Sequence, residues 1–425
     1  PPPGQLLPLG LQHVVAAVVG VITPAILVAD TCGLSSADKT LMIQVSLILT
    51  ALATLLQLFP IFHRIGSGLP VIMGISFAYI PTLQAIGGEF GLPTILGAEI
   101  VGGIVAIVFG VLVKWIRPLF PPLVTGTVIF TIGLSLYPTA VKYMAGGAGS
   151  EWFGSAKSWA VALITLAVVV FLNHFTKGIT KLASILIGIL AGYVIAYFLG
   201  IVDLSGVGSA AWVALPRPMP FDIQFVPAAC VSLGIVYVVN AVQTIGDLSS
   251  TTMGGMDRMP TDKELSGGIV GQGVMSILGA FFGGLPAATY SQNVGIVTVN
   301  RVINRAVFAL AALILLVAGL VPKFASLLTT IPQCVIGGAT ISVFATITMT
   351  GIRMITEGGF TPRKSSVVGL SVALGVGITQ VSGCLAGEGF PAWVNTVFGS
   401  SSVVVAALMA ILLNLILPKE PSANG

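Results

Sequence analysis

Charged residues are scarce in this chain, because only 8% of its 425 residues are Asp, Glu, Lys or Arg while 56% are hydrophobic. A soluble domain carries roughly 25% charged residues, so a soluble globular protein is excluded. Apolar runs of about 20 residues, long enough to cross a bilayer, recur throughout, for example at 41–58, 100–116 and 306–321. The sequence therefore predicts a polytopic membrane protein.

Other signals are also missing. The net charge is only +4, and no basic block could bind nucleic acid. The four cysteines show no CxxC pairing and no nearby His, which argues against a metal site or a disulfide framework. Walker, dinucleotide-binding and HExxH motifs are absent, so we expect no cofactor and no catalytic residues. The first apolar run, 9–28, lacks a basic n-region and a cleavage site, and is interpreted as a span.

Proline, glycine and charged residues divide the chain into fourteen predicted crossings. With a cytoplasmic N-terminus, thirteen of the 18 Lys and Arg residues fall on the cytoplasmic side and five outside, which predicts that both termini are cytoplasmic. The crossings lie near 8–28, 40–60, 68–86, 94–116, 119–138, 158–175, 182–201, 225–246, 264–283, 285–300, 304–322, 333–351, 365–383 and 400–417.

The two halves of the chain share features. A Gly-Leu-Pro at 68–70 recurs at 284–286, and a Pro and Gly at 122 and 126 recur at 332 and 337. Seven crossings per half force opposite orientations, so the sequence predicts an all-α membrane protein with a 7+7 inverted repeat. Crossings three and ten are rich in Gly, Pro, Ser, Asn and Gln and are predicted to be strand-like. Irregular backbone at membrane depth must line a cavity or be buried in protein, so these segments should meet at a pocket. The alternative is that their glycines serve only close helix packing.

Polar side chains in the spans mark a candidate site. Asn240, Gln243 and Asp247 share one predicted helical face, although Asp247 could instead cap the end of that helix. Gln272 follows in crossing nine, and Ser291, Gln292 and Asn293 in crossing ten. Carboxamides offer donors and acceptors that suit a flat heterocycle, on which Phe77 or Tyr290 could stack. His13 and Glu99 lie inside spans and are either structural or functional.

The chain resembles the nucleobase/ascorbate transporters, also called uracil/xanthine permeases or nucleobase:cation symporters, over nearly its whole length. The most specific similarity is between 291–295, continuing to Arg301, and the family signature Q/E-N-x-G. Further similar motifs are found at 11–13, 69–77, 244–247, 351–355 and 412–418.

The resemblance implies a core domain of residues 1–117 and 220–322, and a gate domain of residues 118–202 and 323–425 that usually forms a homodimer interface. It also implies that backbone groups of the half-strands hold the base. Gln292 is similar to the purine-handling type, which favours xanthine, urate, guanine or hypoxanthine. The candidate substrate-binding residues are Gln243, Gln292, Asn293, Phe77, Ala78, Tyr290, Ser291 and Gly295.

The chain departs from the family pattern at two sites, because Gln243 stands where the family usually has Glu and Gln272 where Asp is common. A carboxamide binds a base but cannot take up a proton. The candidate residues for H+ or Na+ coupling are Asp247, His13, Glu99 and Gln272. Asp247 is favoured among them. Asn300 and Tyr290 also depart from the usual Thr and Phe, which bears on substrate choice.

The sequence thus predicts a purine transporter of a plasma or bacterial inner membrane, working by alternating access in the lipid bilayer without nucleic acid partners. A uracil carrier is an alternative. A sulfate/bicarbonate-type anion carrier of the same fold would need a basic residue in the pocket, and crossings three, eight and ten offer none before Arg301. An intramembrane enzyme or sensor is the remaining alternative, and it would need a nucleophile with a base, or a soluble domain.

Overall fold

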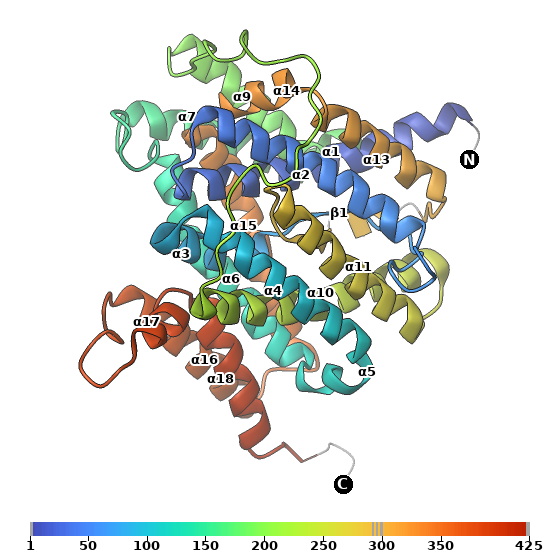
Figure 1. Cartoon of the computed structure of the whole chain (residues 1–425), viewed down its shortest axis with the longest axis vertical. Coiled ribbons are helices and arrows are strands. Elements are labelled where there is room, and N and C mark those ends of the chain that lie inside the picture. The colour runs from blue at the N-terminus through green and yellow to red at the C-terminus, as the bar shows by residue number, and fades with distance from the viewer. Residues whose placement is uncertain (1–2, 291–292, 295, 298–300, 422–425) are drawn as a thin grey trace.

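The computed structural model describes residues 3–290, 293–294, 296–297 and 301–421. Helices dominate these ranges, as the apolar runs predict (Figure 1). The first part of the chain contains α1 Pro3–Thr31, α2 Ser36–Leu58, α3 Ile80–Phe90, α4 Leu92–Val111, α5 Val113–Ile116, α6 Pro122–Met144, α7 Ala156–Phe175, α8 Ile179–Leu182 and α9 Ser184–Phe198. The second part contains α10 Pro227–Met256, α11 Asp262–Phe281, α13 Arg305–Gly319, α14 Pro322–Thr329, α15 Gln333–Thr356, α16 Pro362–Gln380, α17 Ala392–Phe398 and α18 Ser402–Ile416.

Seven helices in the described ranges are long and apolar enough to cross a membrane. Two further pairs, α13 with α14 and α17 with α18, are bent by 79° and 85° and bring the number to as many as nine if each pair is one span. The protein is therefore a mostly helical, multi-pass membrane protein. The count of fourteen crossings and the inverted repeat stay predictions, because several predicted crossings are occupied by shorter helices or by strands.

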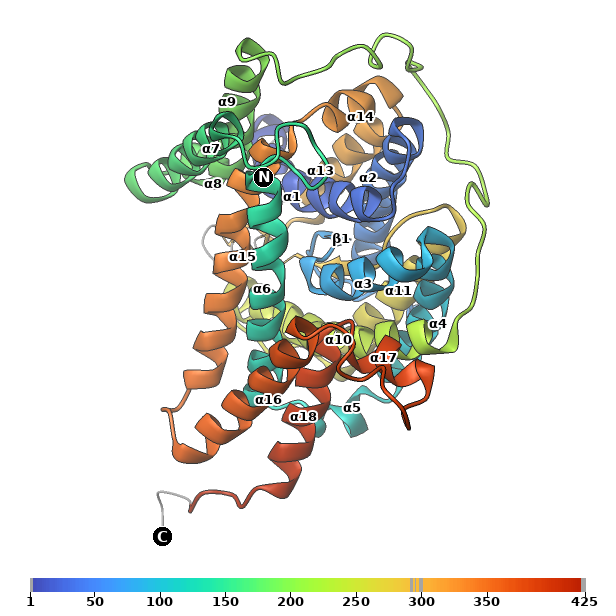
Figure 2. The same ribbon diagram turned by 90° about the vertical axis from the view of Figure 1, so that its left-hand side faces the viewer.

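The helices pack in two groups. In one, α4 lies against α10 and α11, while α2 lies against α13 and α1. In the other, α6 runs along α15, and α16 along α18, as Figure 2 shows. The α6–α15 contact depends on glycine, because a Cβ on Gly126 would lie 3.0 Å from the Gly351 carbonyl oxygen. The second glycine of the repeated Pro and Gly pattern, Gly337, packs against the backbone of Met144 in the same way.

Helix α10 is longer than predicted. It continues ten residues past the expected end at 246 and stops at Met256, where Asp257 adopts the left-handed conformation with φ of 54°. Residues 247–256 remain helical, and within them the Thr252 hydroxyl donates to the Leu248 carbonyl four residues earlier, at 3.1 Å. Asp247 is therefore an interior residue of α10, and the interpretation of it as a capping residue was wrong.

The two strand-like segments are confirmed. The strands β1 Met73–Ile75 and β2 Ala287–Thr289 pair antiparallel, with Met73 opposite Thr289 and Ile75 opposite Ala287. Each strand follows one of the two Gly-Leu-Pro sequences, and every residue of both strands is buried. The pair lies between α2 and α11, near the middle of the molecule (Figure 1).

Candidate functional site

Tyr290 locks the strand pair. Its backbone N–H donates to the Ile72 carbonyl at 3.0 Å, and its hydroxyl donates to the Ile75 carbonyl at 2.9 Å. The ring lies where a Cβ on residue 74 would overlap it, so this contact requires Gly74. Tyr290 is 4% exposed, which leaves Phe77 as the candidate aromatic with the more accessible face.

Asp247 holds β2 against α10. Its Oδ2 accepts a hydrogen bond from the Thr289 hydroxyl at 2.6 Å, and Asp247 as a whole is 7% exposed. The expected single face of α10 is divided, because Asn240 and Asp247 are buried while Gln243 is only half-buried. Gly246, one turn after Gln243, is exposed, so Gln243 is the side chain at the accessible edge of this site.

Gln272 belongs to the buried side of α10. Its Oε1 accepts a hydrogen bond from the Thr244 hydroxyl at 2.9 Å, and its Nε2 has no partner among the described residues. Because Thr244 directly follows Gln243 in the sequence, Gln272 supports the turn of α10 that carries Gln243 rather than replacing it at the edge.

His13 meets Asn293 from α1. The Asn293 Nδ2 donates to the His13 carbonyl oxygen at 3.1 Å and lies 3.1 Å from His13 Nδ1. The imidazole packs on Phe308, with ring centroids 4.4 Å apart. Both His13 and Asn293 are 1% exposed, so this contact joins α1 to the segment after β2 inside the protein.

Phe77 begins the short 3-10 helix η1, Phe77–Tyr79, directly after β1. The Ser76 hydroxyl caps this turn by accepting from the Ala78 N–H at 3.1 Å. Phe77 is half-buried and lies edge-on to Phe344 of α15, with centroids 5.3 Å apart. It therefore lies at the contact between the two helix groups. Ser291, Gln292 and Gly295 lie outside the described residues.

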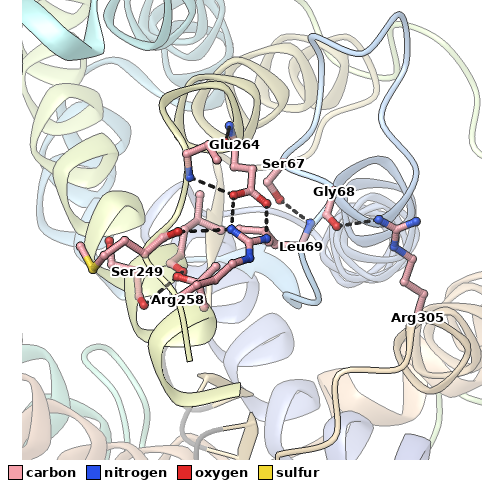
Figure 3. Close-up of polar contacts among 11 residues, drawn as sticks. Ser67, Gly68, Leu69, Ser249, Arg258, Glu264 and Arg305 are labelled. Atoms are coloured by element: carbon pink, nitrogen blue, oxygen red, sulfur yellow. Dashed lines mark hydrogen bonds and ion pairs between the residues drawn. The ribbon is translucent and has the colours of Figure 1, made fainter. Parts of the chain in front are cut away.

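Figure 3 shows the polar contacts around the start of the first Gly-Leu-Pro. Arg305 Nη2 donates to the Gly68 carbonyl at 3.0 Å, and the Ser67 hydroxyl accepts from the Leu69 N–H at 3.1 Å. Nearby, Arg258 makes two hydrogen bonds with Glu264, at 2.7 and 2.8 Å, and the carboxylate raises the pKa of the guanidinium.

Sequence reasoning missed several supporting side chains. Thr54 of α2 accepts from the Met73 N–H at 3.0 Å, and Ser276 of α11 accepts from the Ala287 N–H at 3.1 Å. Gln57 bridges two segments, since its Oε1 accepts from the Ser67 N–H at 2.9 Å and its Nε2 donates to the Gly268 carbonyl at 3.0 Å. The available signal was the presence of polar residues within long apolar runs, but it does not specify which backbone group each one meets.

The arrangement offers hydrogen bonding and stacking. Gln243 lies on α10, which packs against both η1, where the half-buried ring of Phe77 lies, and β2, which Asp247 fixes to α10. Such a combination of an apolar surface with a few placed polar groups suits a flat heterocycle.

Comparison with known proteins places the chain among permeases. The family model Xan_ur_permease, described as Permease family, matches residues 4–383. The xanthine permease of Bacillus subtilis is 35% identical over 421 residues, covering 97% of this chain and 94% of that protein. The uric acid permease PucK of Bacillus subtilis is 35% identical, covering 99% of this chain and 97% of that protein. The uric acid transporter UacT of Escherichia coli is 32% identical, covering 97% of this chain and 86% of that protein.

Solved structures share the fold at low identity. The transmembrane domain of the cyanobacterial bicarbonate transporter BicA matches with a TM-score of 0.59 at 16% identity, covering 96% of this chain and 97% of that domain. Murine Slc26a9, an anion transporter in its inward-facing state, matches with a TM-score of 0.64 at 11% identity, covering 96% and 68%.

Proposed function

The chain belongs to the Permease family (Xan_ur_permease), and from this premise we propose that it carries a purine base across the membrane. It is a nucleobase transporter rather than an enzyme, in line with relatives that are named xanthine and uric acid permeases. Xanthine and urate are the leading substrates, with guanine and hypoxanthine after them.

The strand pair packed against α10, the helix that carries Gln243, is the observation that carries this proposal. Buried strands leave backbone donors and acceptors at membrane depth, where an unsatisfied group is costly, and a base can satisfy them. We place the base between Gln243, Phe77 and the strand ends, with Gln292 and Asn293 completing the site.

Transport follows alternating access in this proposal. Residues 1–117 and 220–322 form the core domain, and residues 118–202 and 323–425 form the gate domain and a homodimer interface. The packing of α4 on α10 and of α6 on α15 supports this division. The inverted 7+7 arrangement of fourteen crossings, the cell membrane as location and cytoplasmic termini complete the proposal.

Coupling to H+ or Na+ is part of the proposal. Asp247, His13, Glu99 and Gln272 are the candidate residues, although Gln272 cannot titrate. The structural similarity to bicarbonate and anion transporters shows the fold alone, and a uracil carrier differs from a purine carrier in the ligand that it prefers. A ligand panel therefore separates these alternatives.

The test is binding of xanthine, urate, guanine, hypoxanthine, uracil and bicarbonate to the purified protein, followed by uptake into proteoliposomes. We expect a purine to bind best, and Gln243→Ala to weaken it by about tenfold, the effect of one hydrogen bond of roughly 1.4 kcal/mol. Gln380→Ala, at the exposed end of α16, is the matched control and should leave binding unchanged. Unchanged binding in Gln243→Ala would refute the site, and binding of bicarbonate but no base would refute the function.

A further inference from the structure

Glu99 is the most isolated acid of the described residues. Only two acids in the described part are buried, Glu99 and Asp247, and Asp247 accepts a hydrogen bond from Thr289. Glu99 lies in α4, is 0% exposed, and neither carboxyl oxygen has a hydrogen-bond partner among the described residues. A charged carboxylate without a partner costs several kcal/mol in such surroundings, so the neutral acid is the form that this packing tolerates.

The surroundings of Glu99 contain other unsatisfied polar atoms. The hydroxyls of Tyr79 and Tyr237 are close enough to interact with it electrostatically, and neither has a hydrogen-bond partner within the described ranges. Their rings lie 4.9 Å apart. The Nδ2 of Asn240, whose side chain is next to the Tyr79 hydroxyl, is unsatisfied as well. These donors lie around an acceptor, and the cluster can accommodate a negative charge only if it rearranges.

Helix α11 closes the cluster from the other side with uncharged residues. Gln272, Ser276 and Gly279 share one face of α11 at spacings of four and three. A Cβ on Gly279 would lie 3.6 Å from Glu99 Oε1, an ordinary van der Waals distance, so this part of α11 packs directly against the carboxyl group. Among the described residues, Tyr79 and Tyr237 are the titratable groups recorded as interacting electrostatically with Glu99.

The cluster reaches the proposed base site along α10. Tyr237, Asn240 and Thr244 follow at spacings of three and four on one side of the helix, and Thr244 is bonded to Gln272. Gln243 directly precedes Thr244. Asp247, one turn after Gln243, accepts the hydrogen bond from Thr289 of β2. A change of charge at Glu99 therefore acts on the same turns of α10 that position the base.

We infer that Glu99 takes up and releases the transported proton, a role that Gln243 and Gln272 cannot have. This inference rests on the proposed base transport. On one side of the membrane a proton from water binds a carboxylate oxygen of Glu99 and the core moves with a neutral acid. On the other side the proton returns to water and the carboxylate is restored, so each base travels with one proton.

The first test measures protons exchanged when xanthine or urate binds. Calorimetry in two buffers of different ionisation enthalpy gives this number, by linkage, at several pH values between about 5 and 8. We expect wild-type protein to exchange protons with the buffer when the base binds, and Glu99→Gln, which is isosteric with the neutral acid, to exchange none while it still binds the base. Glu89→Gln, at an exposed residue near the end of α3, is the matched control and should behave like wild type.

The second test measures accumulation in proteoliposomes with the membrane potential held at zero. A gradient of about one pH unit can concentrate the base about tenfold if one proton accompanies it. We expect this accumulation in wild type and Glu89→Gln, and only equilibration in Glu99→Gln.

Several outcomes overturn the inference. Three results would overturn the role of Glu99 and leave the proposed function standing. They are base binding by wild type without proton exchange at any pH, pH-driven accumulation of the base by Glu99→Gln, and accumulation that is driven by sodium alone. Failure of wild type to bind any base overturns both. If Glu99→Gln does not fold, Tyr237→Phe replaces it. Loss of the Tyr237 hydroxyl, which lies close enough to interact electrostatically with Glu99, should then move the midpoint of proton exchange to higher pH, and an unchanged midpoint counts against the proposal.

Discussion

Asp30, in the last turn of α1, connects the two helix groups, and its replacement by Asn should loosen that connection. Its Oδ2 accepts hydrogen bonds from the Tyr143 hydroxyl of α6 at 2.6 Å and from Gln333 Nε2 of α15 at 3.0 Å. Its Oδ1 forms an ion pair with Lys39 of α2. The Asp30 side chain is only 15% exposed, so these contacts are partly shielded from water.

The expected cost of Asp30→Asn follows from the two bonds between helix groups. A hydrogen bond to a charged group contributes roughly 1.5–3 kcal/mol, against roughly 0.5–1.5 kcal/mol for a neutral one. Changing both bonds therefore costs about 2 kcal/mol, and the part-exposed pair with Lys39 adds little. Because 1.4 kcal/mol corresponds to a factor of ten, the population with α1 separated from α6 and α15 should rise about 30-fold.

Cys334 provides a native reporter for this separation. It follows Gln333 directly, is 2% exposed, and packs in an apolar cluster with Val19 of α1 and Met144 of α6. We expect the rate of maleimide alkylation at Cys334, followed by mass spectrometry of its peptide, to rise about 30-fold, since modification of a transiently open state tracks its population. Asp203→Asn removes the same charge from an exposed loop residue and is the control. A rise below about threefold, or an equal rise in the control, would refute the reasoning.

Three further substitutions test how the site is supported. Thr54→Val leaves the Met73 N–H without its acceptor and should lower the free energy of unfolding, measured by thermal denaturation, by about 1–3 kcal/mol. The control Thr50→Val removes a hydrogen bond within α2 and should lower the free energy of unfolding much less. Equal losses in the two variants would contradict this prediction. Gly267→Ala places a Cβ on the Gly66 carbonyl oxygen and should lower the free energy of unfolding by about 1–3 kcal/mol. The control Gly369→Ala lies in open space on α16 and should leave that free energy unchanged or raise it. The reverse order of the two effects would count against the packing argument. Glu264→Gln breaks the ion pair with Arg258, in which the side chains of Arg258 and Glu264 are 44% and 18% exposed. The loss in free energy of unfolding should therefore stay below about 1 kcal/mol and become smaller at high salt. A loss that persists at high salt would show another cause.

The membrane-spanning character was predictable because it depends on composition and run length, which are local properties. The strand-like character of the two segments that contain the strands at 73–75 and 287–289 was also predictable, since each begins at a Gly-Leu-Pro and is rich in Gly, Pro, Ser, Asn and Gln. Asp247 shows where local reasoning failed. The predicted crossing ended at 246, which made Asp247 a possible helix cap, but α10 continues to Met256.

Pairings between distant residues could not be predicted from spacing. Nothing near Thr289 in the sequence indicates that its hydroxyl meets Asp247, 42 positions earlier. Likewise, Asn293 was predicted to contact substrate, and the structure bonds it to His13 of α1, 280 positions away. A single sequence shows which side chains are polar, whereas the partner of each one is decided by how the helices pack.

In both halves of the chain, a backbone N–H of the short strand is hydrogen-bonded by a hydroxyl from a neighbouring helix. A two-stranded sheet leaves outer edges with unpaired backbone groups, which are costly inside a membrane. In each strand the N–H of the first residue is satisfied by a hydroxyl from a helix of the same half, Thr54 of α2 for Met73 and Ser276 of α11 for Ala287. These helices correspond to crossings two and nine, which are equivalent in the predicted 7+7 arrangement, so the shared device supports the inverted repeat. The surrounding helices thus supply a partner for the first backbone N–H of each short strand.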